Sequence, residues 1–587
     1  MTHKKTSCAT AWTISFFAVL VVATFLCAQH ATAQARPLPG PDVPALYQKL
    51  LKQIDAIPIY DNHSHPSFAD DPDVDAMASP PDASSVLRLR DTNPEWVAAA
   101  KALFGYPYDD FAPEHAKWII EKKKVAEKDG STAYFNGILD KLNIETCLAN
   151  RVALAPYLDP KRFHWVFCAD AFLFPLNNRS LIAKNPDMAV YIPLQEKLLQ
   201  RYMMQEARKA MPADLADYEA FVRQTLADNQ KRGGVAMKFE AAYFRSLRFS
   251  DPPRDKAEAI FARYAWNPEP PSDDDYRTFQ DYIFRVLLDE AGKLHLPAHF
   301  HSAVGVGDYF SLRQGNPLNL ENVLRDPRYR NISFVLVHGG YPYDREAIWM
   351  AAAKNVYLDS SLMGYYLYPA ELKRTLKQWL ELFPEKIMFG ADAFPFNDAI
   401  GAEETFWLAV RSARTALAAA LAEMVSTGDV SEEQAMQLAR MYLHDNAARL
   451  YGAKTMSQPG EATKQEAPMK YIRWKDVEQE KLSPLIDRQF VVGQQVMVAR
   501  ILLKKGAHVP MHQHVNEQVT YILEGALKFH IDGKEIVVHA GEVLCIPPNL
   551  PHEAWAIEDT VDVDVFDPPR EDWINKTDDY LRGAPKR

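Results

Sequence analysis

The hydrophobic positions of this chain follow two patterns, which meet near residue 454. Before that point, short apolar runs that end in polar residues alternate with longer stretches in which apolar residues recur at helical spacing. The short runs predict eight strands, at Ile57–Asp61, Glu145–Leu148, His164–Cys168, Val235–Lys238, Pro297–His301, Ile332–Val337, Val356–Asp359 and Lys386–Phe389. Eight strands with helices between them predict an α/β fold, a (β/α)8 TIM barrel over residues 45–453.

The predicted helices include one long insertion. Residues 403–424 carry apolar side chains at helical spacing, and Ser431 with Gln434 forms a capping box that begins the last helix. The first crossover, residues 66–143, is far longer than an ordinary βα loop and contains helical stretches at 95–104 and 116–128. We expect a lid-like insertion there. The lysine run at 122–124 is interpreted as a solvated helix face.

The second pattern begins after residues 454–469, which are polar, contain Pro and Gly, and predict a linker. From about residue 470, short β-branched runs are separated by Gly, Pro and Asn. This pattern predicts a small all-β domain over residues 470–587.

The N-terminus has the features of an export signal. Lys4 and Lys5 precede an apolar stretch at 11–27, and Ala31 and Ala33 are small residues at the cleavage-determining positions. We expect residues 1–33 to be removed near Ala33 and the mature protein to be periplasmic or secreted. The apolar stretch is shorter than a spanning helix needs, so no stable membrane anchor is expected, with an uncleaved anchor as the alternative.

Charge and cysteine content exclude some classes of protein. The formal net charge of -11 disfavours a nucleic-acid partner, because an acidic surface repels phosphate. Removal of the signal would leave Cys147, Cys168 and Cys545, too few for a disulfide framework. We expect Cys147 and Cys168 to be buried thiols, with a bridge between them as the alternative.

Side chains that bind metals follow several of the predicted strands. His63 and His65 follow the first strand, and two residues at i and i+2 of an extended chain share a face. The fourth, fifth, sixth and eighth strands end at Lys238, His301, His338 and Asp392. Because the carboxyl ends of barrel strands meet at one mouth, these positions predict a metal site.

Residues 45–453 resemble metal-dependent enzymes of the amidohydrolase superfamily, in particular the amidohydrolase domain that is fused to glutamine-synthetase-like proteins. The segments that carry the resemblance are Asp61–His65, Lys238–Arg245, Phe300–Ser302, Gly307–Asp308, Asn316–Pro317, His338–Glu346, Val356–Ser360, Gly390–Asp392 and His444–Ala447. His299 departs from the family pattern, and we expect it to support the site from behind the ligands.

The resemblance implies a role for each strand-end residue. His63, His65 and His301 would hold a divalent ion, most plausibly Zn²⁺. Such an ion lowers the pKa of bound water from about 16 toward about 7. Asp392 would accept the proton of that water, a role we place above its role as a further ligand. His338 would bind a second ion or polarise the substrate carbonyl.

Three basic residues complete the candidate site. Lys238 would bridge two ions as a carbamate, pair with a substrate carboxylate, or serve a structural purpose, and these alternatives stay open. Arg245 and Arg345 are candidate anchors for a substrate carboxylate.

The C-terminal domain has a second set of metal-binding residue types. His512, His514 and Gln518 all stand at even positions and are expected to face inward together, whereas Glu517 faces out. With His552 they resemble the paired motifs of the cupin family, a small β-barrel that often holds a metal. Neutral ligands of this kind suit Zn²⁺, Ni²⁺, Cu²⁺, Mn²⁺ or Fe²⁺, so the metal stays open, as does a catalytic or an accessory role.

The sequence therefore predicts an exported metalloprotein that acts on a small molecule. The first hypothesis is metal-assisted hydrolysis of a C–N bond, an amide of a small carboxylate-bearing metabolite. The second is non-oxidative decarboxylation of a small aromatic or unsaturated acid. The third is a non-catalytic binding or sensing protein that acts through the cupin domain. Association into a homo-oligomer is left open.

Overall fold

The structure, a computed structural model, describes residues 45–75, 85–208, 210–455, 471–493, 496–574 and 576–582. The predicted export signal, residues 1–33, lies outside the described residues. The chain divides into two compact units, Met1–Glu461 and Ala462–Arg587, and each is described by itself. None of the helices in the described ranges is long and apolar enough to cross a membrane.

The first unit is built on a barrel of parallel strands, as predicted. Neighbouring strands pair in chain order from β1 to β8. Their bounds are β1 Ile59–Ser64, β2 Ile144–Asn150, β3 Phe163–Cys168, β4 Gly234–Phe239, β5 Ala298–His301, β6 Phe334–Val337, β7 Val356–Asp359 and β8 Ile387–Met388. Backbone hydrogen bonds from Asn62 N to Phe389 O (2.9 Å) and from Asp392 N to His63 O (2.6 Å) join the last strand segment to the first and close the barrel.

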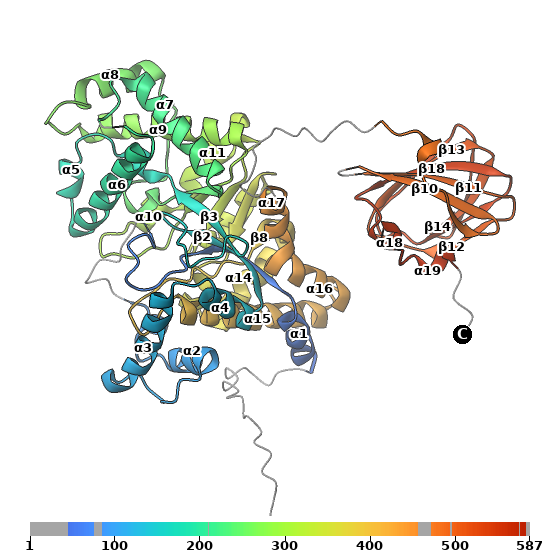
Figure 1. Cartoon of the computed structure of the whole chain (residues 1–587), viewed down its shortest axis with the longest axis horizontal. Helices are drawn as coiled ribbons and strands as arrows, with labels where there is room; N and C mark the ends of the chain where they lie inside the picture. Colours follow the sequence, from blue (N-terminus) through green and yellow to red (C-terminus); the bar gives the residue numbers. More distant parts are fainter. Residues whose placement is uncertain are drawn as a thin grey trace, which may run out of the picture. The chain divides into compact units, whose positions relative to one another are not determined.

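Helices surround this barrel (Figure 1). The longer ones are α1 Ala45–Asp55, α2 Pro94–Phe104, α3 Pro113–Asp129, α4 Ala133–Leu142, α6 Pro186–Gln205, α7 Leu215–Lys231, α8 Arg254–Tyr264, α9 Asp273–Leu294, α14 Pro369–Leu382, α15 Ala402–Thr427, α16 Glu432–Arg440 and α17 Asn446–Thr455. Single-turn helices are α5 Arg179–Ile182, α10 Leu312–Gly315, α11 Glu321–Leu324, α12 Asp344–Ala347 and α13 Met363–Tyr366. The predicted capping box at Ser431 and Gln434 begins α16.

The barrel interior is filled by side chains and closed by the last helix of the unit. Tyr60, Val166 and Val337 belong to a buried cluster that also contains Ala447 and Tyr451 of α17. Helix α17 continues to Thr455, so the first two residues of the predicted linker are helical and the others lie outside the described residues.

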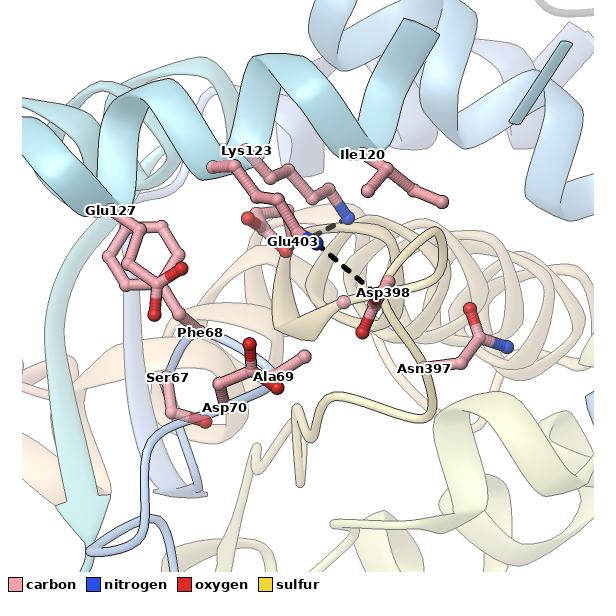
Figure 2. A pocket seen from close by; sticks show the side chains of 12 residues that line it. Ser67, Phe68, Ala69, Asp70, Ile120, Lys123, Glu127, Asn397, Asp398 and Glu403 are labelled. Carbon is pink, nitrogen blue, oxygen red and sulfur yellow. Dashed lines mark ion pairs between the residues drawn. The ribbon is translucent and has the colours of Figure 1, made fainter. Parts of the chain in front are cut away.

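The insertion between β1 and β2 carries α2, α3 and α4, as expected from its length. Figure 2 shows how α3 is fixed to the barrel: Lys123 points toward Glu403 at the start of α15. The Lys123 ammonium is buried and lies 3.3 Å from Glu403 and 2.6 Å from Glu404. The interpretation of residues 122–124 as a solvated face is therefore wrong for Lys123, because carboxylates far away in the sequence pair with it.

The second unit is an all-β barrel, as predicted. One antiparallel sheet has the strand order β16-β13-β18-β11-β10-β9, and the other has the order β12-β17-β14-β15. The bounds are β9 Glu480–Ser483, β10 Ile486–Val492, β11 Met497–Leu503, β12 His508–His512, β13 Glu517–Glu524, β14 Ala526–Ile531, β15 Lys534–His539, β16 Val543–Ile546, β17 His552–Ala556, β18 Thr560–Asp567, α18 Glu571–Ile574 and α19 Asp579–Arg582. Cys147, Cys168 and Cys545 are free thiols, and the first two are buried as expected.

Candidate metal centres

Three side chains converge at the mouth of the TIM barrel. His63 Nε2 and His65 Nε2 lie 3.3 and 3.4 Å from the same atom, Asp392 Oδ1. These separations match the edges of a tetrahedron whose metal–ligand bonds are about 2.0–2.1 Å long. Burial and the charge of Lys238 hold the pKa of His63 well below its usual value, so His63 is neutral and able to bind a metal.

This geometry suits Asp392 to bind a metal, in addition to the predicted role as a base. Burial acts to raise the pKa of Asp392, but the charge of His338 and hydrogen bonds with His63 and His65 hold it well below its usual value. Tyr365 on α13 donates a hydrogen bond of 2.8 Å to Asp392 Oδ2, which fixes the second oxygen. The carboxylate is therefore ionised and positioned.

An unusual backbone conformation positions two residues of the site, Asp392 and His338. Asp392 and His338 have φ values of +55° and +63°, in the left-handed region that residues with a Cβ seldom adopt. Gly339 follows with φ +54°, and a Cβ there would meet the ring of Trp379 at 2.1 Å. The two glycines after His338 thus allow the chain to turn sharply at the end of β6.

Two further side chains support the segment that carries His63 and His65. Asp75, from the insertion, lies 3.2 Å from His65 Nδ1 and thereby directs His65 Nε2 toward the centre. Asp61 accepts hydrogen bonds from Ala391 N (2.7 Å) and Ser64 Oγ (2.5 Å), which ties the end of β1 to the segment after β8. Asp61 is therefore a structural member of its motif.

His301 and His338 form a separate pair beside the first three residues. His301 Nε2 contacts the carbonyl of Val304 at 2.8 Å, and because a carbonyl only accepts, this nitrogen carries the proton. Ser361 donates its single hydroxyl hydrogen to Asp359, so His338 Nδ1 is the donor to Ser361 Oγ at 2.9 Å. The two remaining nitrogens, His301 Nδ1 and His338 Nε2, lie 3.1 Å apart with no hydrogen between them when both rings are neutral.

Two facing lone pairs repel unless a proton or a cation joins them. Burial lowers the pKa of both His301 and His338, so a shared proton is disfavoured near neutral pH. A divalent cation bound to both nitrogens satisfies this arrangement, so the donor set fits a second ion. In this geometry His301 belongs with His338 rather than with the predicted set of His63 and His65.

A chain of hydrogen bonds supports His338 of the His301–His338 pair. Asp359 Oδ1 accepts from His338 N (3.0 Å), and its Oδ2 accepts from Asn62 Nδ2 (2.6 Å). Tyr451 donates to Asn62 Oδ1 (2.7 Å) and lies 2.7 Å from His299 Nε2. His299 therefore supports the site indirectly and lies one layer deeper than His301 on the same strand, which agrees with the expectation for it.

Lys238 is buried, with its ammonium 3.0 Å from Glu240 Oε1 and 3.5 Å from His63 Nε2. Burial acts to lower the pKa of Lys238, but the charges of Glu240 and Asp75 outweigh it and raise the pKa. Carboxylation requires an uncharged amine, so this environment favours the ion-paired lysine over a carbamate.

The residues of the candidate site in the first unit line one cavity of about 650 Å³. Its described lining residues are His63, His65, Asp75, Lys238, Glu240, Tyr243, His301, Gly305, Val306, His338, Leu362, Tyr365, Tyr366, Asp392, Phe394 and Phe396. The aromatic side of this cavity can hold an apolar part of a substrate.

Neither predicted arginine anchor lines the cavity. The guanidinium of Arg245 is buried and donates to Asp281 at 2.5 Å and to Gln280 at 3.1 Å, so the protein itself supplies its carboxylate. Arg345 is exposed on α12, whereas His338 is buried in the cavity wall. The structure therefore gives no support to either arginine as a substrate ligand, because proximity to a motif in sequence does not fix the direction of a long side chain.

The second unit gathers His512, His514 and His552, whose ligand atoms lie within 4.8 Å of one another. Their Nδ1 atoms contact the backbone carbonyls of Pro510, Asn516 and Leu550 at 2.8–3.0 Å. Each Nδ1 therefore carries the proton, and each Nε2 offers a lone pair. Burial holds the pKa of His512 at about 3 and that of His514 at about 4, so both rings are neutral.

Gln518 completes this cluster. Its amide nitrogen donates to Thr520 Oγ1 (2.8 Å) and Asp564 Oδ1 (2.9 Å), which turns Oε1 toward His514 Nε2 at 3.1 Å. Two acceptors thus face each other, an arrangement that a cation satisfies. The predicted set is together in the structure, and Glu517 is exposed as expected.

Comparisons with known proteins find similarity to each of the two units. Residues 254–453 match the family model "Amidohydrolase", and residues 499–567 match the family model "Cupin domain". The resemblance to amidohydrolases with a C-terminal cupin is thereby confirmed. Protein fluG of Emericella nidulans is 35% identical over 182 residues, which cover 30% of this chain and 20% of that protein.

Solved structures similar to each unit include three of interest. A protein assigned as a metal-dependent hydrolase from Lactobacillus casei is 18% identical, with coverage of 70% of this chain and 99% of that one and a TM-score of 0.46. An RmlC-like cupin from Shewanella frigidimarina is 30% identical, with coverage of 18% and 94% and a TM-score of 0.17. KdgF from Halomonas sp. is 24% identical, with coverage of 18% and 98% and a TM-score of 0.18.

Proposed function

We propose that this protein, which carries an amidohydrolase domain followed by a cupin, is a metal-dependent hydrolase that cleaves a C–N bond of a small molecule with water. The observation that carries the proposal is the convergence of His63, His65 and Asp392 beside the His301–His338 pair in one cavity. Divalent ions bound there acidify a water molecule and polarise a carbonyl group.

The side chains of the cavity divide the remaining work. Asp392 takes the proton of the attacking water and passes it to the leaving nitrogen, because it is ionised and held by Tyr365. Ser361 and Asp359 fix the ring of His338 so that Nε2 faces the cavity. Tyr243, Phe394 and Phe396 supply apolar surface for the substrate and exclude water.

Lys238 is the cationic residue among the described side chains that line this cavity. With Arg245 and Arg345 placed elsewhere, a carboxylate on the substrate would meet either Lys238 or an ion. Because Glu240 already pairs with Lys238, the proposed substrate does not need a carboxylate.

A substrate panel tests the reaction class. The purified protein is loaded with Zn²⁺ and given small amides with and without a carboxylate, the matched esters, and aromatic acids, while amine release and CO₂ release are both measured. Amine release that His63→Ala abolishes supports C–N hydrolysis. Release of CO₂ without amine would instead establish the decarboxylase hypothesis, and a metal-loaded protein inert on the whole panel would contradict the proposal.

We also propose that the protein is exported. Lys4, Lys5 and the small residues Ala31 and Ala33 support this proposal. N-terminal sequencing of the secreted or periplasmic fraction should find a chain that begins near Gln34. A membrane-bound chain that begins at Met1 would contradict it.

A further inference from the structure

One wall of the cavity in the first unit is made by residues 393–401, an irregular segment between β8 and α15. Phe394 and Phe396 of this segment line the cavity. The ring centroid of Phe394 lies 5.7 Å from that of His65, and the ring centroid of Phe396 lies 6.1 Å from that of Tyr365. The shape of the aromatic side of the cavity therefore depends on where this segment is held.

Backbone hydrogen bonds define the local conformation of the segment. Phe394 N donates a hydrogen bond of 3.1 Å to Thr405 Oγ1 of α15, which fixes the start of the segment to the barrel. Phe396 N donates one of 2.9 Å to the carbonyl of Ile400 and so closes a tight turn. This second bond lies within the turn, so contacts with other elements must fix the place of the turn beside Tyr365.

The insertion between β1 and β2 supplies such contacts from the outer side of the turn. Trp96 of α2 is fully buried, and its ring centroid lies 6.2 Å from that of Phe396. Lys123 of α3 donates a hydrogen bond of 3.0 Å to the carbonyl of Ala399. Two helices of the insertion therefore contact the turn, one at Phe396 and the other at Ala399.

Lys123 makes its contact as part of a buried ionic cluster (Figure 2). Its ammonium lies 2.6 Å from Glu404 and 3.3 Å from Glu403, both at the start of α15. Tyr134 of α4 donates a hydrogen bond of 2.6 Å to Glu403. Burial acts to lower the pKa of Lys123, but the charges of the two glutamates outweigh it and raise the pKa. One buried cation thus joins α3, α15 and the carbonyl of Ala399.

The backbone of the segment passes directly against this cluster. A Cβ at Gly401 would meet Glu403 Oε2 at 2.1 Å and Lys123 Nζ at 2.8 Å. Separating α3 from the segment would break a buried ion pair, which is costly because it leaves a charge without its partner. We therefore expect α3 and the segment to keep a fixed position relative to each other.

Lys124, the next residue of α3, provides a contrast. Its ammonium lies 3.8 Å from Asp398 of the same segment, and the two side chains are 59% and 51% exposed. Exposed ion pairs contribute little to stability, because water and salt screen them and both side chains lose freedom. Of these two lysines, the buried Lys123 is the one suited to position the segment.

From these contacts we propose that the insertion determines the substrate specificity of the cavity and that Lys123 is the positioning residue through which it acts. This inference rests on the proposed function. Helices α2 and α3 hold the turn at Phe396 and Ala399, and the turn presents Phe396 to the apolar part of the substrate. In this role the insertion is a fixed wall of the cavity rather than a lid that opens in each reaction cycle.

Hydrogen exchange of the Zn²⁺-loaded full chain tests the positioning without a substrate. Lys123→Met removes the charge and keeps most of the side-chain volume, so the amides of residues 393–401 should exchange about tenfold faster or more while the barrel strands keep their protection. Lys124→Met is the matched control and should change nothing. Unchanged exchange in Lys123→Met, or an equal change in Lys124→Met, would overturn the proposal.

A second variant covers the charges that Lys123→Met leaves without their cation. In the double variant Lys123→Met with Glu404→Gln, one of the two carboxylates becomes neutral, and the glutamine oxygen can still accept the hydrogen bond from Gly401 N. The double variant should show the same faster exchange at residues 393–401. Wild-type exchange there in a folded double variant would overturn the proposal.

Kinetics test the specificity, with N-benzoylglycine and N-acetylglycine as matched substrates. Lys123→Met should lower the ratio of their kcat/KM values, benzoyl over acetyl, about threefold to tenfold, the range for loss of an aromatic contact. The change should be in KM, with kcat kept. In a Phe396→Ala background the same substitution should not lower the ratio further, because Lys123 acts through Phe396. Additive effects of the two substitutions would overturn the proposal.

The two proposals fail in different ways. A zinc-loaded chain that hydrolyses no amide contradicts the proposed function, and the exchange of residues 393–401 then still decides whether Lys123 positions the segment. An active chain whose Lys123→Met variant keeps both the exchange and the substrate ratio of the wild type would support the proposed function and overturn this inference.

Discussion

We propose two roles for Asp392, metal ligand and general base, and one substitution can distinguish them if bound metal and kcat are both measured. Because its Oδ1 lies 3.3–3.4 Å from Nε2 of both His63 and His65, Asp392→Asn should weaken zinc binding as well as catalysis. We expect kcat to fall about 10²-fold or more even when excess zinc restores full occupancy, since an amide cannot take the proton. Bound metal and kcat are measured on the same preparation. A variant that retains its zinc and near-full kcat would rule out the role.

Tyr365 offers a pH-dependent test of the same carboxylate. Its hydroxyl stabilises the ionised form of Asp392, so Tyr365→Phe should raise the pKa of Asp392. Activity requires the ionised form and is lost as pH falls through that pKa. The acidic limb of the kcat/KM profile should therefore move upward by about one pH unit. Tyr366→Phe in the same cavity is the control, and an equal shift in both variants would contradict the assignment.

At the scale of elements, the turn after β6 depends on Gly339. A Cβ there would meet Trp379 on α14 at 2.1 Å, in a backbone conformation with positive φ. Gly339→Ala should cost about 2 kcal/mol or more, through overpacking added to backbone strain. Gly428→Ala, at the end of α15, has φ +81° but open space around it and should cost about 1 kcal/mol. Thermal unfolding gives the loss of stability for each variant. Equal losses of stability would mean that the contact with Trp379 is unimportant.

The sequence predicts these elements better than it predicts side-chain directions. Buried parallel strands are short apolar runs whose last residues are polar, so all eight are recognisable in the sequence. His301 ends one of them, Asp392 follows another, and both line the same cavity. Tyr365 lies on a single-turn helix, and nothing in its local pattern distinguishes it from other tyrosines. The sequence does not reveal the burial of Lys123 and Arg245, because tertiary packing supplies their partners, Glu404 and Asp281.

Asp75 and Glu240 illustrate the same limit at the site. Glu240 stands within the motif that begins at Lys238, and its position two residues after Lys238, just beyond the end of β4, is the signal that could have identified it. Asp75 lies in the insertion, well after the end of β1, where no periodicity indicates that the chain returns to the mouth of the barrel.

For the whole molecule, the two metal centres should be separable because they share no ligands. His63→Ala should abolish turnover and reduce the bound zinc of the first centre, while the zinc of the second centre is kept. His512→Ala should do the reverse. Metal content per chain, measured for both variants and the double variant, checks this. Loss of all metal in either single variant would mean that the centres depend on each other.

The hydrogen-bonded line from His338 through Asp359 and Asn62 ends at Tyr451, on the helix that is made last in the first unit. During synthesis the mouth of the barrel thus stays without this support until about 450 residues have been made, about 20 seconds or more at ordinary translation rates. For protein engineering, a cut that separates the two units must fall beyond Thr455. A shorter fragment would keep every predicted metal ligand of the first unit and still lose the alignment of His338.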